Sequence, residues 1–222
     1  MKLLLCAAVA FLPAASHAAT ADDFQVWSSF QASGSISGRV VGGLELSGRF
    51  VDDAGRLGVA IVRPTIGYKL TDHLIVHLGY AHQTTINQNR RDVQEDRIFQ
   101  QINWTMGKIG KATLSSRTRF EQRFVNTGND TGLRARFQLK YSLPLKRKGT
   151  NLVMSTEPLI ALNTTNWGQR AGLDQWRNFI GVNMPLAKAL SLETGFQHRY
   201  QVRLNQPDRS DFIVPITLSY KF

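Results

Sequence analysis

The chain has 222 residues, with 27 Lys and Arg against 16 Asp and Glu, and a formal net charge of +11. Its mean hydropathy is slightly negative. After the first 18 residues no stretch approaches the ~18 consecutive apolar residues of a membrane helix, which excludes a helical membrane protein. The basic excess alone would suit nucleic acid. The start of the chain argues against that partner, because it predicts export.

The first 18 residues have the three parts of a secretory signal peptide. Lys2 provides the basic start, an apolar run occupies 3–13, and small residues at 16–18 form the cleavage pattern. We therefore expect residues 1–18 to be removed and residues 19–222 to form a single domain. An exported chain seldom meets nucleic acid, so no nucleic-acid partner is expected.

From residue 23 onward, apolar and polar residues alternate with the period of two that is typical of strands with one apolar face. The last segment shows this clearly, with an apolar residue at every second position from Phe212 to Phe222. The patterned segments are, in chain order, 23–33, 38–50, 57–70, 74–84, 97–106, 111–125, 133–144, 151–162, 176–186, 189–203 and 211–222.

Segment 111–125 carries charges on one face and aromatic rings on the other. In SRTRFEQRFV, alternation puts Arg117, Arg119, Glu121 and Arg123 opposite Phe120 and Phe124. The two phenylalanines are also one helical turn apart, so an amphipathic helix fits the segment taken alone. The neighbouring segments decide for a strand, because their alternation fits no helical period.

The connections between these segments alternate in length. Those at 71–73, 107–110, 145–150 and 187–188 are brief, whereas those at 85–96, 126–132, 163–175 and 204–210 are longer and polar. Short turns on one rim and long loops on the other are the signature of a transmembrane β-barrel, with apolar residues facing lipid. A secreted soluble β-barrel that binds a ligand is the alternative, with the two faces inverted.

The number of strands is harder to predict than their existence. Eleven segments are visible, whereas bacterial barrels have an even number of strands. Either 23–33 does not span, which leaves ten strands, or one strand is hidden and there are twelve. We therefore predict an all-β, antiparallel transmembrane barrel of 10–12 strands.

Several short motifs, in their order along the chain, resemble a known family. They are Trp27, the pair Glu45 and Arg49, RFEQR at 119–123, LRAR at 133–136, Glu157, WRN at 176–178 and the aromatic final strand. Together they resemble the bacterial outer-membrane barrels catalogued as domain of unknown function 2490, over nearly all of the mature chain. The resemblance implies a location in the outer membrane of a Gram-negative bacterium and brings no established activity.

The carboxyl terminus resembles the signal that the barrel-insertion machinery reads, which has aromatic residues at the last and third-last positions. Those positions are Phe222 and Tyr220. Thr217 stands where glycine is common and Pro215 where a polar residue is usual. We expect the insertion machinery to be a partner, and the outer-membrane lipid and lipopolysaccharide to be the surroundings.

Strand parity turns a set of charged residues toward the interior, where a charge must be paired to be tolerated. The predicted interior network consists of Glu45, Arg49, Arg117, Arg119, Glu121, Arg123, Arg134, Arg136, Glu157, Arg177, Glu193 and Arg199. Two interpretations stay open. The network plugs a structural barrel, or the surplus of basic residues lines a narrow pore that favours small anions.

Catalytic and metal chemistry find little support in the sequence. The one cysteine, Cys6, lies in the predicted signal peptide, and no histidine has a serine beside it in a recognisable hydrolase motif. No metal or cofactor site is expected. A lipid-acting enzyme of the outer membrane is therefore the lesser alternative, with inward-facing His77 as its best base. The basic loop at 89–91 could contact lipopolysaccharide phosphates.

Overall fold

The computed structural model describes residues 21–203 and 206–222, so the predicted signal peptide lies outside the described residues. No helix in this part of the chain is long and apolar enough to cross a membrane. The strands are β1 (Ala21–Ser37), β2 (Val40–Val51), β3 (Arg56–Lys69), β4 (Leu74–Thr85), β5 (Val93–Ile109), β6 (Ala112–Val125), β7 (Gly132–Pro144), β8 (Asn151–Ala161), β9 (Gly172–Pro185), β10 (Leu190–Gln201) and β11 (Arg209–Lys221).

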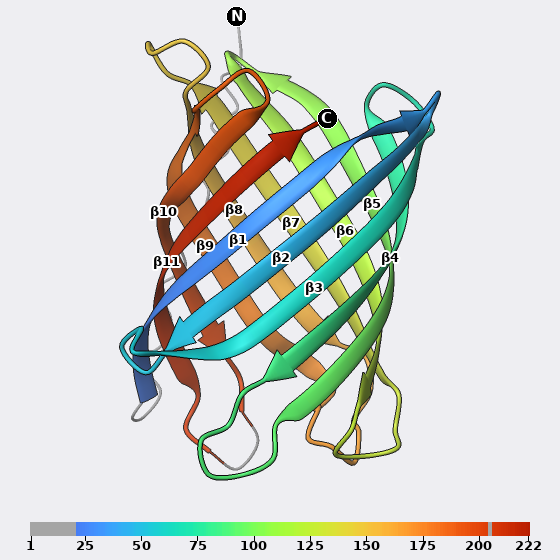
Figure 1. Ribbon diagram of the computed structural model, residues 1–222, viewed down its shortest axis with the longest axis vertical. Coiled ribbons are helices and arrows are strands. Elements are labelled where there is room, and N and C mark those ends of the chain that lie inside the picture. The colour runs from blue at the N-terminus through green and yellow to red at the C-terminus, as the bar shows by residue number, and fades with distance from the viewer. Residues whose placement is uncertain (1–20, 204–205) are drawn as a thin grey trace, which may run out of the picture.

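The strands form a closed barrel in which each strand pairs with the next and β1 pairs with β11 (Figure 1). All sequential pairs are antiparallel, whereas the closing pair β1·β11 is parallel, in register from Ala21↔Arg209 to Ser33↔Lys221. The predicted barrel of 10–12 strands is therefore confirmed, with eleven strands, and neither the ten-strand nor the twelve-strand alternative applies. Segment 23–33 belongs to the 17-residue strand β1, which spans the whole wall.

An odd number of strands has a simple geometric consequence. In a wall of sequential antiparallel strands, the first and eleventh strands run in the same direction. Closure then requires a parallel ladder, whose hydrogen bonds are slanted and evenly spaced. The even-number rule assumes an antiparallel closing pair, which this barrel does not have.

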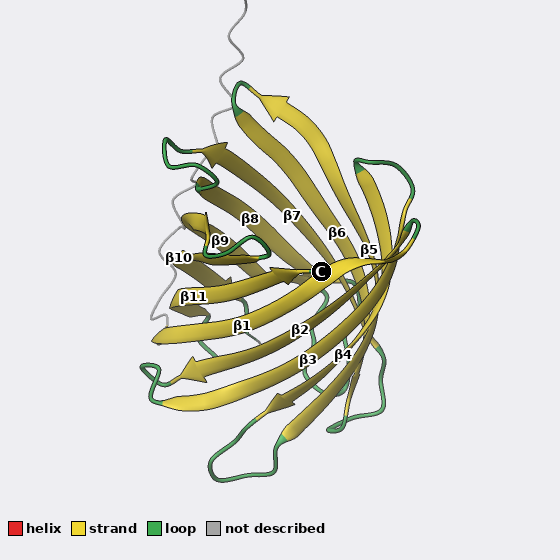
Figure 2. Ribbon diagram, turned by 45° about the horizontal axis from the view of Figure 1, so that its top comes forward, coloured by secondary structure: helices red, strands yellow, loops and turns green. Residues whose placement is uncertain are grey.

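The two rims differ as the connection lengths predicted. The carboxyl terminus and the turns at 38–39, 70–73, 110–111, 145–150 and 186–189 lie at one end, hereafter the short-turn rim. The connections at 52–55, 86–92, 126–131, 162–171 and 202–208 lie at the other end, the long-loop rim (Figures 1 and 2). β1 therefore begins at the long-loop rim.

Two strands extend further toward the long-loop rim than their sequences suggested. β5 starts at Val93 rather than 97, and β9 starts at Gly172 rather than 176. Each extension contains a single apolar residue, Val93 or Leu173, so neither shows the alternation by which strands were recognised. Ladder hydrogen bonds persist there because backbone pairing does not need an apolar face.

The outer surface of the wall is apolar, with aromatic rings toward both rims. Exposed aromatic side chains near the long-loop rim are Phe24, Tyr80, Phe124, Trp176 and Phe212, and those near the short-turn rim are Tyr68, Trp104, Tyr220 and Phe222. Most charged residues of the strands point inward instead, whereas Asp96 accepts a hydrogen bond from exposed Tyr80 on the outer face. This is the arrangement of a transmembrane barrel and the reverse of a soluble one.

The parallel closing pair can be tested by cross-linking. Ser29 lies opposite Thr217 in the β1·β11 register. Neighbouring strands are about 4.8 Å apart, which suits a disulfide. We expect Ser29→Cys with Thr217→Cys to form a disulfide that makes the unfolded chain migrate faster on a non-reducing gel. The mature chain has no other cysteine to compete.

The matched control is Ser28→Cys with Thr217→Cys, because adjacent strand residues point to opposite faces of the wall. This pair should stay reduced. If segment 23–33 did not span, neither pair would cross-link, and the eleven-strand closure would be wrong.

Candidate functional site

Glu121, on β6, lies at the centre of the charged interior, and its side chain has 0% relative exposure. Its Oε2 accepts hydrogen bonds from Arg134 Nε at 2.8 Å and Nη2 at 2.6 Å, and its Oε1 accepts one from Arg136 Nη1 at 3.0 Å. Arg119 Nη1 lies 3.5 Å from the same Oε1. Three guanidiniums on two strands therefore share one buried carboxylate.

Glu157, on β8, is the second buried carboxylate of the network. Arg136 donates to it from Nε at 3.2 Å and from Nη2 at 2.9 and 3.0 Å, and Arg117 Nη2 donates at 2.8 Å. Arg177 Nη1 is 4.0 Å away. Arg136 therefore bridges Glu121 and Glu157, and the cluster spans β6 to β9.

Arg123 does not join this cluster, although it was predicted to belong to the same interior network. It donates to Glu95 Oε1 at 2.5 Å and to Gln169 Oε1 at 2.9 Å. Arg97 also donates to both oxygens of Glu95, at 2.7 Å each. Sequence reasoning missed Glu95 because it began this strand at 97, and it passed over Arg97 at the first position of that segment. Extending the alternation backward from Gln101 would have found them.

A third cluster surrounds the indole ring of Trp27, on β1. The guanidinium carbon of Arg49 lies 4.0 Å from the ring centroid, and those of Arg177 and Arg199 lie 5.3 Å from it. Arg199 donates from Nε to Asp211 Oδ2 at 2.7 Å. Asp211 was also missed, although its position two residues before the inward-facing Ile213 is a usable signal.

The remaining predicted residues lie outside these clusters. Glu45 accepts from Arg63 Nη1 at 2.6 Å, and Glu193 accepts from Lys140 Nζ at 2.8 Å. Glu193 is closer to water, because its side chain is 25% exposed. The structure thus divides eleven of the twelve predicted residues among several ion-paired groups, and Arg49 contacts Trp27 without an ion pair in the described part of the chain.

Apolar side chains occupy the space between these charged groups. Phe99, Leu159 and Ile213 point inward and are fully buried. Phe99 also supports the network directly, since the guanidinium of Arg119 lies 4.2 Å from its ring centroid. Arg119 additionally donates to Gln101 Oε1 at 2.7 Å from Nε. Charged and apolar side chains thus pack against each other around Arg119.

His77 has no serine among its hydrogen-bonding partners in the described part of the chain. Its Nε2 lies 3.1 Å from Asn103 Nδ2. A serine does approach a different histidine, since His198 Nε2 lies 2.7 Å from Ser210 Oγ. These two residues lie on the outer face of β10 and β11. Sequence reasoning missed this pair because the register across the 202–208 connection was unknown.

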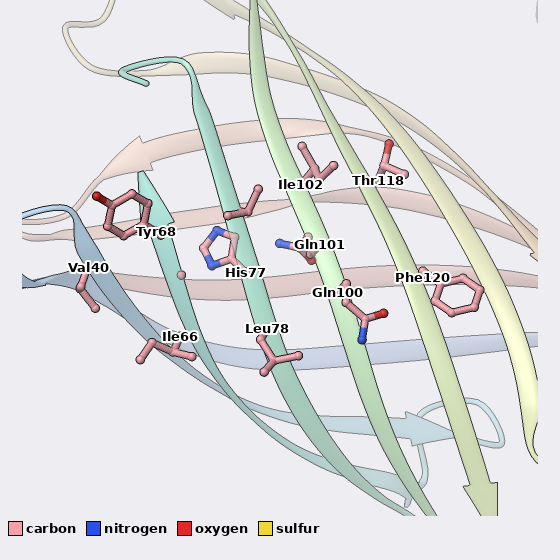
Figure 3. Close-up of a pocket in the computed structure, with 12 residues that line it drawn as sticks. Val40, Ile66, Tyr68, His77, Leu78, Gln100, Gln101, Ile102, Thr118 and Phe120 are labelled. Carbon is pink, nitrogen blue, oxygen red and sulfur yellow. The ribbon is translucent and has the colours of Figure 1, made fainter. Parts of the chain in front are cut away.

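An apolar hollow of about 700 Å³ lies on the wall formed by β2 to β6 (Figure 3). Ile66, Leu78 and Ile102 line it from the exposed outer face. His77 and Gln101, which pair in register on β4 and β5, come from the inner face. The surface of the hollow is almost entirely apolar.

The two residues of the predicted insertion signal lie at the short-turn rim. Tyr220 and Phe222 both expose their rings. The backbone N–H of Phe222 donates to Ser33 O at 3.2 Å, which ties the terminus to β1. At the opposite rim, the basic stretch at 89–91 is exposed within the connection 86–92.

The profile of a family described as "Protein of unknown function (DUF2490)" matches residues 24–210. An uncharacterized protein of Methylorubrum extorquens is 37% identical over 185 residues, which cover 82% of this chain and 81% of the relative. Both matches include the strands that carry Glu121, Arg134, Arg136 and Glu157.

Solved structures show a likeness of fold. The NanC porin has a TM-score of 0.55 and 13% identity, over 86% of this chain and 91% of that chain. The siderophore receptor PirA from Pseudomonas aeruginosa has a TM-score of 0.33 and 14% identity, over 75% of this chain and 33% of that chain. At such identities only the porin-like barrel fold is shared. The likeness to the NanC porin is the comparison that shows this fold.

The buried position of Glu121 predicts a large effect of removing its charge. Glu121→Gln leaves Arg134, Arg136 and Arg119 short of a counter-charge in a site without water contact. We expect the free energy of unfolding to fall by about 3–5 kcal/mol. Urea titration in detergent, with the difference in gel mobility between unheated and boiled protein as readout, measures this loss.

Glu193→Gln is the matched control, because it removes the same charge from a partly exposed ion pair. Its cost should be about 1 kcal/mol or less. Equal and small losses in both variants would mean that water reaches Glu121 and that the interior is wet.

Proposed function

The chain belongs to the DUF2490 family of proteins of unknown function, and we propose that it is a non-enzymatic outer-membrane barrel whose interior is plugged by its own charged network. The single observation that carries the proposal is the complete burial of Glu121 between guanidiniums from two strands.

The outer surface supports a place in the outer membrane. Exposed leucine, isoleucine and aromatic side chains cover the wall, and aromatic rings gather toward both rims, as in barrels that span a bilayer. A closed ladder leaves no strand edge to be satisfied by water. The predicted signal peptide supplies the export that this location requires.

Residues at the two rims indicate the proposed partners of the barrel. Tyr220 and Phe222 would be read by the barrel-insertion machinery, and the lipid-facing wall would contact membrane lipid. Arg90 and Arg91, exposed at the long-loop rim, are suited to lipopolysaccharide phosphates.

The packing of the interior favours a plug over a conduit. Fully buried Phe99, Leu159 and Ile213 separate the charged clusters, and Glu121 and Asp211 have 0% relative exposure. A conducting pore needs a water-filled path past its charged residues. Because the buried carboxylates and the apolar side chains beside them are equally inaccessible to solvent, we infer that this path is closed.

A narrow pore that favours small anions is the second candidate. One observation supports it: the interior cations outnumber their carboxylate partners, and Arg136 and Arg177 share Glu157 with Arg117. A basic lining of this kind selects anions where it is hydrated. The two candidates therefore differ in whether water occupies the interior.

Recordings in planar bilayers distinguish the two candidates. We expect the purified protein to give no channel currents in chloride salts, because its interior is packed. Its folded state is checked in the same preparation by the heat-dependent gel mobility.

Small, steady currents that favour chloride over potassium would overturn the plug. If Arg119→Glu with Arg136→Glu then reduced or reversed that preference, the charged interior would be the selective path and the anion-pore function would stand.

The lipid-acting alternative now has a more specific candidate pair in His198 and Ser210. A serine and a histidine within hydrogen-bond reach are two of the groups of a hydrolase, but an orienting third group and an oxyanion site are also needed. We expect fatty-acid release from phospholipid vesicles to stay at the level of a detergent blank, in the wild type and in Ser210→Ala alike.

The decisive contrary result would be hydrolysis above the blank that Ser210→Ala and His198→Ala abolish. In that case His77→Ala serves as the control, since it should leave the rate unchanged. Such a pattern would assign a hydrolase to the outer face of β10 and β11.

A further inference from the structure

A small cavity opens inside the long-loop rim and is distinct from the packed cluster around Glu121. Its volume is about 200 Å³, and it lies among the rim ends of β1 to β4, β10 and β11. Four arginines line it, namely Arg49, Arg56, Arg199 and Arg209. We propose that this cavity binds a small anionic solute, a carboxylate or a phosphate, with Arg49 as the principal ligand.

The pairing of charges leaves Arg49 available. Arg56 Nε donates to Asp52 Oδ2 at 2.5 Å. Arg199 and Arg209 both donate to Asp211, whose side chain is fully buried.

Arg49 has no ion pair or hydrogen bond within residues 21–203 and 206–222, and its buried Nε is without a partner there. A buried guanidinium without a counter-charge is unfavourable, and an anion in the cavity would relieve this.

Arg49 is held in place although no carboxylate in the described part of the chain binds it. Trp27 lies directly opposite in the β1·β2 register, and the guanidinium carbon is 4.0 Å from the ring centroid. The ring is fixed in turn, since Trp27 Nε1 donates to Gln25 Oε1 at 2.8 Å. Contact with the ring face leaves the N–H groups of the fork free for a two-point contact with a carboxylate or phosphate.

The walls of the cavity are tied together before any ligand arrives. Asp23 accepts from the backbone N–H of Asp53 at 3.0 Å and from Arg209 Nη2 at 2.5 Å, which links the 52–55 turn to β11. Arg56 Nη1 donates to Ile86 O at 3.0 Å, which links β3 to the end of β4. A site with fixed walls loses less conformational entropy when it binds.

The size and position of the cavity define the class of ligand. About 200 Å³ is below the ~300–1,000 Å³ of pockets for drug-sized molecules, so a small acid fits and an oligosaccharide does not. The cavity lies on the inner side of the wall, where a dissolved anion can arrive from the long-loop rim. Buried Trp27 and Ile213 lie toward the interior. A ligand can thus reach the site from the long-loop rim, whether or not the interior of the barrel conducts.

The test is a titration of the folded, full-length mature barrel in detergent with inorganic phosphate or succinate, against sodium chloride at equal ionic strength. Tryptophan emission and the thermal unfolding midpoint are measured. We expect saturable changes in both, because Trp27 contacts Arg49 and a ligand stabilises the folded state. Trp27→Phe should lose the fluorescence response and keep the thermal one.

Arg49→Gln should weaken binding about 10- to 100-fold, the loss expected for hydrogen bonds to a charged group. Arg49→Lys keeps the charge without the planar guanidinium fork, so its affinity for the anion should lie between those of the wild type and Arg49→Gln. Arg147→Gln removes one exposed charge from the 145–150 turn at the opposite rim and should bind like the wild type. Heat-dependent gel mobility shows that each variant is folded.

Three results would overturn the proposal. The first is the absence of a saturable response to either anion. The second is equal weakening by Arg49→Gln and Arg147→Gln, which would indicate a general charge effect. The third is a response to dodecyl phosphate carried in the micelle but not to dissolved phosphate, which would place the anion site on the lipid-facing surface.

Discussion

The pairing of buried charges is the constraint on which this structure depends. A carboxylate with no access to water is tolerated only where cations and hydrogen bonds replace its hydration. Glu121 meets this condition through Arg134 and Arg136, and Glu157 through Arg136 and Arg117. Because these residues come from β6, β7 and β8, the barrel must hold three strands in one register to satisfy two carboxylates.

The closure of the wall is linked to the same constraint. The parallel β1·β11 pair brings Trp27 and Gln25 from the start of the chain to Asp211 near its end. With ten strands and no spanning β1, the guanidiniums of Arg49, Arg177 and Arg199 would lose the ring that they share. The first strand therefore supplies interior chemistry as well as a ladder.

The balance of positive and negative charge differs between parts of the interior. Around Glu121, Glu157 and Glu95 each carboxylate serves two or more cations, so the positive charge is shared and packed. Toward the long-loop rim beside Trp27, Arg49 contacts an aromatic face in place of an acid. The proposed plug in the middle and the proposed anion site at one rim are thus compatible within one barrel.

The sequence by itself determined the class of fold and the face of each strand. A period of two is a local property of each strand, and it can be read along the chain because apolar residues face the bilayer and charged residues face the interior. It also determined which residues face the interior, such as Glu121 and Arg136. Only the tertiary structure decided the strand count, the pairing of Arg123 with Glu95, the approach of Ser210 to His198 and the lack of an acid at Arg49. These features depend on register between strands and on how the two ends of the wall meet, and alternation along one strand carries no information about either.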